Sequence, residues 1–325
     1  VLFTLKNNKD MVLRGKFELI RQKFEELFPG LTFESVTGPN VLFRDSNSPP
    51  YEVPVQAVGM GIVETLNFIT NLMGLKDQIL LIDTPESHLH PHSQRLLAKI
   101  FHEYKSENQV FLITHSPYFI DPKNIPCHHV IRLRNGHTEA KSIVPGYFTT
   151  EETNKLRREL LTPSSRELLF ARAVLLVEGG TELGAMPIFA ERIGKPFDEQ
   201  GITVQPVGSD TNFPIYERLL EAFDIPYVIM ADSSWRRSTS KAPDENVFQL
   251  SSDFEGVLKE AVANNLLERA KREVGSTIRQ PRKIQVGIYV AEEIPPNKIP
   301  SPFIEVIDRI TKVATIQQEP NEQSG

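Results

Sequence analysis

The sequence predicts an α/β protein in which two successive regions each form a parallel sheet. Three apolar runs support this prediction: ILLI precedes Asp83, VFLIT precedes His115, and AVLLV precedes Glu178. Short continuous apolar runs are typical of strands buried on both faces, and amphipathic segments between them are typical of the crossover helices of βαβ units.

The composition is that of an ordinary globular protein with about two domains. The chain has 325 residues, and its 36 Lys and Arg against 42 Asp and Glu give a net charge of 36 − 42 = −6. This balance excludes a strongly basic nucleic-acid binder, so any DNA contact must come from a local surface. No apolar run approaches the roughly 20 residues of a membrane helix, and we expect no membrane contact. The single cysteine, Cys127, excludes an internal disulfide framework, so we expect a reducing, cytoplasmic environment.

The first expected domain, residues 1–148, begins with an amphipathic helix that Pro29 and Gly30 bring to an end. The rest of this domain alternates helices with apolar strands. Its expected elements are helices over residues 15–28, 61–73 and 93–105 and strands over residues 31–36, 41–44, 78–83 and 110–114.

A polar segment, residues 149–170, is expected to link this domain to a second one over residues 171–316, and residues 317–325 are expected to be a disordered tail. The second domain repeats the βαβ order. Its expected elements are strands over residues 173–177, 202–207 and 227–231 and helices over residues 182–192, 212–223 and 252–264, while residues 283–291 fit either a strand or a helix.

Four residues of the first domain are candidates for a nucleotide site. Asp83 ends a predicted buried strand, where a carboxylate can hold hydrated Mg²⁺ beside phosphates or can instead cap the following helix. His115 ends the next strand and can reach the same phosphate. Gly59 and Gly61 precede a helix in VGMGIVETLNFI and can present backbone N–H groups to an anion.

These pieces, in this order, resemble the C-terminal half of an ABC-type ATPase head, with its signature motif, Walker B strand, D-loop and His switch. The resemblance covers about residues 55–120, and ESHLHP and ITHSP are similar to the forms found in ATPases of the OLD (overcoming lysogenization defect) nuclease family. It implies ATP as a ligand and a homodimer formed through this half. The nucleotide contacts that it implies are Gly59, Gly61, Asp83 and His115.

Two departures from this pattern argue against ATP hydrolysis by this chain alone. No GxxxxGK[ST] phosphate loop occurs in the sequence. Thr84 stands where the family carries a catalytic Glu, and a Thr hydroxyl cannot act as a general base. We therefore expect a partial ATPase domain, truncated at its N-terminus or completed by further sequence.

Three histidines follow the Walker B strand. His88, His90 and His92 alternate as zinc ligands on a strand would, but Pro91 interrupts the pattern. The resemblance favours a D-loop packed at a dimer interface over a zinc site.

Acidic residues also follow two strands of the second domain. Glu178 follows AVLLV, and Asp232 follows YVIMA. Glu182 lies one turn beyond Glu178, after two glycines that allow a tight turn. The ends of parallel strands lie side by side, so these acids can converge on one or two divalent cations, which clamp the attacking and leaving oxygens of a phosphodiester. Either strand-end acid taken alone is more often a helix cap, but their matched positions favour a metal site.

The pattern hhhhEGxTE, a βα unit and then hhhhDxx resembles the Toprim domain of topoisomerases, primases and OLD nucleases, and EGGTELGAMPIFAERIG is most similar to the OLD family. The resemblance covers roughly residues 170–295. It implies that Glu178 is the first metal-site acid and a candidate general base, that Glu182 is a second ligand, and that Asp232 is the first acid of a DxD pair. Ser234 takes the position of the second acid, where a neutral hydroxyl is a poor ligand for Mg²⁺.

Three further residues are candidates for the same site. Asp253 and Glu255 in SSDFEGVL fit the family's ligand pattern, although Ser252 and Glu255 also have the spacing of a capping box. Lys283 matches the family lysine that stabilises charge at the scissile phosphate, or it is a solvated lysine in a basic run.

Basic residues near these acids are either contacts for a DNA backbone or solvated surface residues. They would supply the local positive surface that the net charge of the chain does not provide. The candidates are Arg236, Arg237, Arg279 and Arg282.

Taken together, the sequence favours an OLD-like, Mg²⁺- or Mn²⁺-dependent DNA endonuclease whose Toprim domain is coupled to or regulated by the ATPase domain. The resemblance implies a role in phage defence or DNA repair. The alternative is a catalytically degenerate relative that binds DNA or protein, because Thr84 and Ser234 replace catalytic groups in both domains. A topoisomerase or primase fragment is less favoured, because the sequence has no nucleophilic tyrosine motif or zinc-binding primase element.

Overall fold

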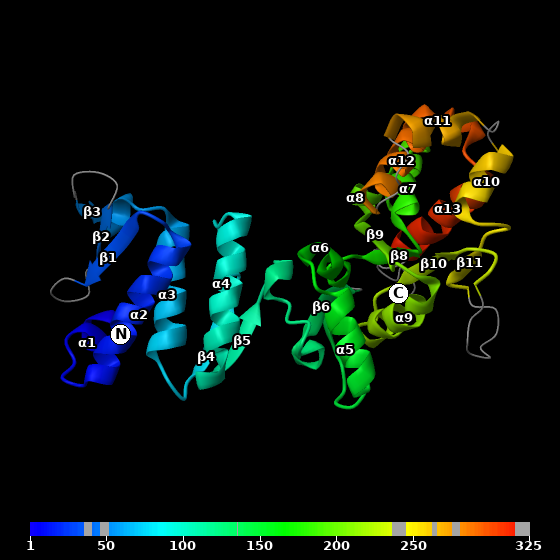
Figure 1. Ribbon diagram of the computed structural model, residues 1–325. Helices are drawn as coiled ribbons and strands as arrows, with labels where there is room; N and C mark the ends of the chain where they lie inside the picture. The colour runs from blue at the N-terminus through cyan, green and yellow to red at the C-terminus, as the bar shows by residue number, and fades with distance from the viewer. Residues whose placement is uncertain are drawn as a thin grey trace. The chain divides into compact units, whose positions relative to one another are not determined.

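The protein forms two compact units, whose helices and strands are drawn in Figure 1. The computed structural model describes residues 1–35, 41–45, 52–134, 136–235, 245–261, 265–274 and 280–315. One unit spans Val1–Asp121 and the other spans Pro122–Gly325. The predicted α/β class is confirmed, and the expected tail, residues 317–325, lies outside the described residues.

The first unit combines an antiparallel sheet with a pair of parallel strands. Strands β1 (Leu31–Ser35), β2 (Val41–Asp45) and β3 (Glu52–Pro54) form the antiparallel sheet, and β4 (Ile79–Asp83) pairs in parallel with β5 (Gln109–Ile113). The helices are α1 (Leu2–Lys6), α2 (Met11–Leu27), α3 (Met60–Gly74) and α4 (Pro91–Tyr104). Helix α2 begins where the Asp10 side chain accepts a hydrogen bond from the Val12 amide at 2.8 Å, and its apolar residues at helical spacing are buried as the pattern predicts.

The parallel pair β4 and β5 is covered on only one face within the first unit. Leu80 is 9% exposed and belongs to a hydrophobic cluster with residues of α3 and α4, whereas Leu81 is 80% exposed. Ile79, Phe111 and Ile113 are exposed on the same face as Leu81. Because parallel strands are normally covered on both faces, this apolar face lacks the second layer of its sheet.

The second unit is built around a parallel sheet with the strand order β11-β10-β8-β9. Strands β8 (Ala173–Val177) and β10 (Tyr227–Ala231) are its centre, flanked by β9 (Ile202–Pro206) and β11 (Val247–Gln249). Every side chain of β8 and β10 is buried, as their continuous apolar runs predict.

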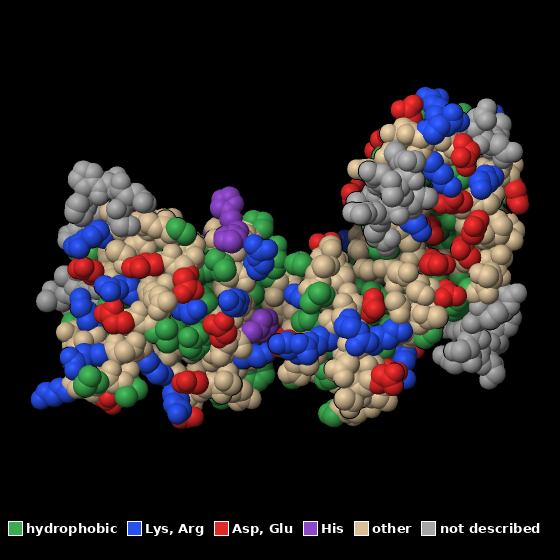
Figure 2. Space-filling model, viewed as in Figure 1, with side chains coloured by type: hydrophobic (Ala, Val, Ile, Leu, Met, Phe, Trp, Pro, Cys, Tyr) green, Lys and Arg blue, Asp and Glu red, His purple; other side chains and the backbone are tan. Residues whose placement is uncertain are grey.

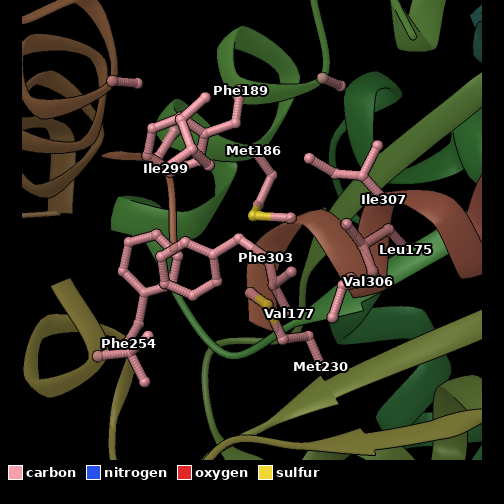
Figure 3. Packing of buried hydrophobic residues seen from close by; sticks show 14 of the residues in the cluster. Leu175, Val177, Met186, Phe189, Met230, Phe254, Ile299, Phe303, Val306 and Ile307 are labelled. Atoms are coloured by element: carbon pink, nitrogen blue, oxygen red, sulfur yellow. The ribbon is translucent and has the colours of Figure 1, made fainter. Parts of the chain in front are cut away.

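Helices of the second unit pack on this sheet and on one another, partly through aromatic side chains. They are α7 (Gly180–Arg192), α8 (Phe197–Gln200), α9 (Phe213–Ala222), α10 (Phe254–Ala261), α11 (Asn265–Val274), α12 (Gln280–Glu293) and α13 (Ser301–Thr315). Figure 3 shows Phe303 of α13 beside Phe189 and Phe254, and the ring centroids lie 5.7 and 4.4 Å apart. Residues 283–291, which fit either a strand or a helix by sequence, are helical. None of the described helices combines the length and the hydrophobicity that crossing a bilayer requires.

The segment expected to be a linker is instead folded. Residues 149–170 contain α5 (Thr150–Glu159) and α6 (Pro163–Arg166), and Leu156 and Leu160 are fully buried. Thr149 and Glu152 form a reciprocal capping box that starts α5. The many charged residues of α5 conceal a narrow apolar stripe, which is why the polar composition suggested a linker.

A hairpin of β6 (His129–Arg134) and β7 (His137–Ser142) also belongs to the second unit, although the sequence boundary after residue 148 assigned it to the first. Arg132 donates a hydrogen bond to the Ala171 carbonyl oxygen at 2.7 Å, and Arg134 donates one to the Asp224 carbonyl oxygen at 2.9 Å. These long-range hydrogen bonds anchor the hairpin beside the parallel sheet, and no local sequence pattern predicts them.

The one-sided burial of β4 predicts unequal effects of two neighbouring substitutions. Leu80→Ala should lower the free energy of unfolding by about 2–4 kcal/mol, because it removes a packed core side chain. Leu81→Ala should change it by less than about 0.5 kcal/mol, because Leu81 contacts little within the unit. Urea denaturation followed by circular dichroism measures both values, and equal losses would contradict the one-sided arrangement.

Candidate functional site

Glu178, Glu182 and Asp232 come together at the carboxyl edge of the parallel sheet in the second unit. Because β8 pairs in parallel with β10, Glu178 and Asp232 directly follow adjacent strand ends. Glu182 lies in the first turn of α7, is only 8% exposed, and has a carboxylate oxygen 3.3 Å from the position that a Cβ on Gly179 would take. The structure thus gathers the three acids that the sequence assigned to a metal site.

Burial and mutual repulsion raise the pKa values of two of these carboxyls. The pKa of Glu182 rises from 4.5 to about 7, mainly because burial disfavours the charged form; a hydrogen bond with its own backbone opposes this rise, and the charges of Asp232 and Glu178 add to it. The pKa of Asp232 rises from 3.8 to about 6, chiefly through burial and then through the charges of Glu178 and Asp253, against a hydrogen bond with the Phe254 backbone. A bound cation would stabilise these carboxylates in their charged form.

One ammonium group acts on the same cluster. The positive charge of Lys283 on α12 lowers the pKa of Glu182, although burial outweighs it. Helix α12 packs tightly on α7 at two glycines. A Cβ on Gly184 would overlap the Ile284 carbonyl oxygen, and a Cβ on Gly287 would overlap the backbone of α7. The two glycines therefore permit the close approach that brings Lys283 to the acids. Glycine inside a predicted helix is the sequence signal that could have identified this contact.

The side chain of Gln249 contacts the start of the loop after β10. The amide of Gln249 donates hydrogen bonds to the carbonyl oxygens of Ser233 and Trp235 at 3.1 and 2.9 Å. Trp235 is 7% exposed and meets Phe213 edge to face at a centroid distance of 5.4 Å, so its ring packs in the core. Ser234 is exposed next to Asp232, at the position predicted for the second acid of the pair.

Asp253 and Glu255 have different surroundings. The carboxylate of Asp253 accepts a hydrogen bond from the Gly256 amide at 2.6 Å, so Asp253 rather than Ser252 caps α10. Its charge also raises the pKa of Asp232, which places it near the acidic cluster. Glu255 forms an ion pair with Lys271 at 2.8 Å. The geometry therefore favours Asp253 over Glu255 as an additional ligand.

The acidic and imidazole candidates of the first unit lie at adjacent strand ends. Asp83 is the last residue of β4 and is paired in register with Ile113, two residues before His115. A carboxylate oxygen of Glu86 accepts a hydrogen bond from the His115 amide at 2.6 Å, so Glu86 fixes the backbone of the predicted His switch. Thr84 has a left-handed backbone, with φ of 44°, and its amide donates to the Ile113 carbonyl oxygen at 2.9 Å.

The glycine pair of the first unit begins α3. Gly59 is the residue that precedes this helix, and Gly61 lies in its first turn. A Cβ on Gly61 would lie 2.8 Å from the His88 carbonyl oxygen, so only glycine lets the histidine loop approach α3 this closely. The predicted signature segment and the predicted D-loop are therefore in contact within one chain.

The histidines of this loop do not gather as a zinc site. His90 precedes α4 as its N-cap, and the ring of His92 lies 3.1 Å from the Arg95 guanidinium. Within the part of the chain that the structure describes, no three His, Cys, Asp or Glu side chains are arranged as a ready metal cage. This holds for the acids of the second unit as well, which face one another as repelling carboxylates rather than as a closed shell.

The structure describes little of the four arginines predicted to contact DNA. Arg236, Arg237 and Arg279 lie outside the described residues, and so does the side chain of Arg282. The backbone of Arg282 belongs to α12, one residue before Lys283. The role of these four arginines stays a prediction from the sequence.

Comparison with known proteins matches both units. Residues 169–233 match the family described as overcoming lysogenization defect protein-like, TOPRIM domain. Residues 9–121 match the family described as AAA domain, putative AbiEii toxin, Type IV TA system. The second unit therefore contains an OLD-like TOPRIM domain, and the first contains an AAA-type ATPase region. The two matched regions confirm the predicted combination of an ATPase region with a Toprim domain.

Three curated relatives are similar to this chain. An uncharacterized protein of Methanocaldococcus jannaschii is 31% identical over 71% of this chain and 29% of the relative. The OLD nuclease of Thermus scotoductus is 28% identical over 58% of this chain and 36% of the relative. Endonuclease GajA of Bacillus cereus is 22% identical over 70% of this chain and 37% of the relative. The chain thus spans about a third of the length of these relatives.

Solved structures of OLD proteins also resemble this chain. The C-terminal region of the Xanthomonas campestris pv. campestris OLD protein is 22% identical, with a TM-score of 0.39, over 47% of this chain and 98% of that structure. The C-terminal region of the Burkholderia pseudomallei OLD protein is 19% identical, with a TM-score of 0.38, over 45% of this chain and 99% of that structure.

Without a divalent cation, the free energy of unfolding should fall as the pH rises from about 4.5 to about 7. In this window Glu182 is ionised in the unfolded chain but still protonated in the folded one, so the unfolded state binds fewer protons and stability decreases with pH. The expected loss is about 3 kcal/mol, at about 1.4 kcal/mol per pKa unit. Urea denaturation across this window in EDTA measures it, and Glu182→Gln should flatten the profile. An equally steep profile for this variant would assign the titration to other groups.

The contact of α7 with α12 predicts a cost for one added methyl group. Gly184→Ala should lower the free energy of unfolding by roughly 1–3 kcal/mol, because the new Cβ meets a backbone carbonyl that can move only if α12 moves. Gly15→Ala is the matched control: Gly15 is also helical but has open space around it, so alanine there should stabilise by about 0.5–1 kcal/mol. Urea denaturation of the two variants tests the contrast, and a neutral Gly184→Ala would argue against tight packing.

Proposed function

We propose that the chain is the nuclease part, with an attached ATPase region, of a divalent-metal-dependent DNA endonuclease. The observation that carries the proposal is the convergence of Glu178, Glu182 and Asp232 on one strand edge, where burial and repulsion raise the pKa of Glu182 to about 7. Clustered carboxyls with perturbed pKa values are typical of functional sites. Two of the curated relatives carry the names of nucleases.

The donor set fits Mg²⁺ or Mn²⁺. Carboxylate oxygens are the ligands these cations prefer, and a cation would offset the mutual repulsion that raises the pKa values of Glu182 and Asp232. Glu178, Glu182 and Asp232 would hold the metal, with Asp253 as a further ligand and Ser234 as a weak one. When bound, the cation supplies electrophilic stabilisation of the phosphate and of the departing oxygen.

Two side chains, Glu178 and Lys283, have further roles in the proposed cleavage of the phosphodiester. Glu178 accepts the proton of the attacking water, because it follows β8 directly at the edge where the other acids meet. Lys283 offsets the negative charge that develops on the phosphate, since its ammonium group already acts on Glu182. Water addition breaks the phosphorus–oxygen bond of the leaving nucleotide and leaves two DNA ends.

For the first unit we propose ATP binding that regulates cleavage. Asp83, His115, Gly59 and Gly61 are the candidate nucleotide contacts, and the ordered backbone between β4 and β5 supports them. Hydrolysis by this chain alone is not part of the proposal, because Thr84 has no basic side chain. Dimerisation through this unit and a role in phage defence or DNA repair belong to the same proposal and rest on the family resemblance.

A second candidate function is a non-catalytic relative that binds DNA or protein. The exposed hydroxyl of Ser234 at the position of the second acid favours it, because that position contributes no charge to a metal. The two candidates differ in the outcome of a single reaction, the cutting of DNA.

Nicking of supercoiled plasmid with Mg²⁺ or Mn²⁺ tests the proposed function. The parent chain should cut, and Glu178→Gln should reduce the rate by at least about 100-fold, because it removes both a ligand and the base. Glu191→Gln, an exposed acid at the far end of α7, is the matched control and should keep the parent rate. An inert parent that gains activity as Ser234→Asp would instead favour the non-catalytic relative.

A further inference from the structure

Helix α5 lies at the same sheet edge as the three acids, on the side of β9. The Glu178 carbonyl oxygen accepts a hydrogen bond from the Gly208 amide at 2.9 Å, so the chain leaving β9 runs directly beside the first acid. A short helical turn, Asp210–Asn212, follows there. Lys155 of α5 donates to the Thr211 carbonyl oxygen in this turn at 3.1 Å. Since adjacent strands are about 4.8 Å apart, α5 is separated from Glu178 by little more than one strand and one turn.

Two of the three acidic side chains of α5, Glu152 and Glu159, make contacts within the protein. Glu152 accepts a hydrogen bond from the Thr149 amide at 2.8 Å and pairs with Arg218 at 3.1 Å. Glu159 accepts hydrogen bonds from the Tyr216 hydroxyl at 3.3 Å and from the Asn212 amide at 3.5 Å. These contacts fix α5 against α9; Arg218 neutralises Glu152, and neutral donors satisfy Glu159.

The two arginines of α5, unlike Glu152 and Glu159, face solvent. Arg157 and Arg158 are exposed, and neither has an ion-pair or hydrogen-bond partner among the residues that the structure describes. They directly follow the buried Leu156, so helical geometry turns both of them away from the core. Figure 2 shows basic side chains gathered over the part of the second unit where Figure 1 draws β6 and α5. Two acids of α5, Glu152 and Glu159, thus contact α9, whereas both arginines are exposed, as is Glu151 in the first turn.

We propose that α5 is a docking surface for the DNA backbone, with Arg157 and Arg158 binding phosphates that flank the one cleaved at the acids. The guanidinium group matches a phosphate bidentately, and successive phosphates of one strand advance about 3.4 Å along the duplex axis, so a few nucleotides bridge the two places. Glu151 is the exposed acid of α5, and Asp210 lies in the neighbouring turn that Lys155 contacts. Asp210 accepts from the Ser209 hydroxyl at 3.2 Å, and Glu151 lies in the first turn, at the far end of α5 from the arginines.

This proposal rests on the proposed function only in taking DNA as the ligand, so binding is tested apart from cleavage. The probe is a fluorescently labelled 20-base-pair duplex, titrated with the whole 325-residue chain in EDTA at several KCl concentrations. Arg157→Gln with Arg158→Gln should weaken binding about 10-fold or more at moderate salt. The slope of log K against log salt should become shallower by about 2, because two phosphate contacts are lost at about 0.9 each.

Two control variants separate a phosphate contact from a structural effect. Lys259→Gln with Lys298→Gln removes the same charge from exposed positions on other elements and should leave both the affinity and the slope close to those of the parent. Arg157→Lys with Arg158→Lys should restore the slope, because the charges return. All three double variants should unfold at the temperature of the parent, since the replaced side chains are exposed.

The outcomes distinguish this proposal from the proposed function. An arginine variant that binds with the affinity and slope of the parent would overturn the docking surface, even if the chain cuts plasmid. A parent chain that does not bind the duplex would also overturn the docking surface. A chain that binds DNA through α5 but never cuts would uphold the docking surface while the nuclease proposal fails.

Discussion

The candidate site depends on the parallel pairing of β8 with β10. In this register Leu176 lies opposite Ile229, so the next acids along each strand, Glu178 and Asp232, reach the same edge. The apolar side chains of both strands are fully buried, and this burial provides the free energy that holds the carboxyls together despite their repulsion. The raised pKa values of Glu182 and Asp232 show that this arrangement disfavours the charged forms of the carboxyls.

The basic groups reach this edge from parts of the chain far apart in sequence. Lys283 arrives on α12 because two glycines let that helix lie against α7. Lys155 arrives on α5, which buried leucines and two satisfied acids fix to the second unit. A cluster of acids with cations on separate helices can receive a polyanion, because each cation meets a different phosphate while the acids hold a metal.

In the first unit, parallel strands also bring candidate residues to one edge, but these strands are covered on only one face. Its two parallel strands place Asp83 near His115, and Glu86 fixes the backbone between them. One face of these strands packs on helices, while the other exposes Leu81 and its neighbours. An apolar sheet face of this kind is typical of a layer that a further part of a protein covers. This agrees with a chain that spans about a third of the length of its relatives.

Much of the architecture follows from local patterns in the sequence. Continuous apolar runs predicted β4, β5, β8 and β10, and the acids that follow β8 and β10 predicted a shared edge, because period and burial are written in neighbouring residues. The polar composition of residues 149–170 concealed α5, and residues 283–291 carried no decisive period. In both places, contacts with distant residues stabilise the helix, and local propensity is too weak to predict it.

The sequence by itself determined the two α/β regions, the family and the identity of the clustered acids, since these depend on residue type and spacing. Only the tertiary structure decided how the candidates are arranged. It brought Asp253 near Asp232, paired Glu255 with Lys271, buried Trp235 against Phe213, and joined Lys155 of α5 to the turn that follows β9. These outcomes depend on which side chains from distant elements meet, and burial and charge pairing there are settled only when the sheet and its helices pack.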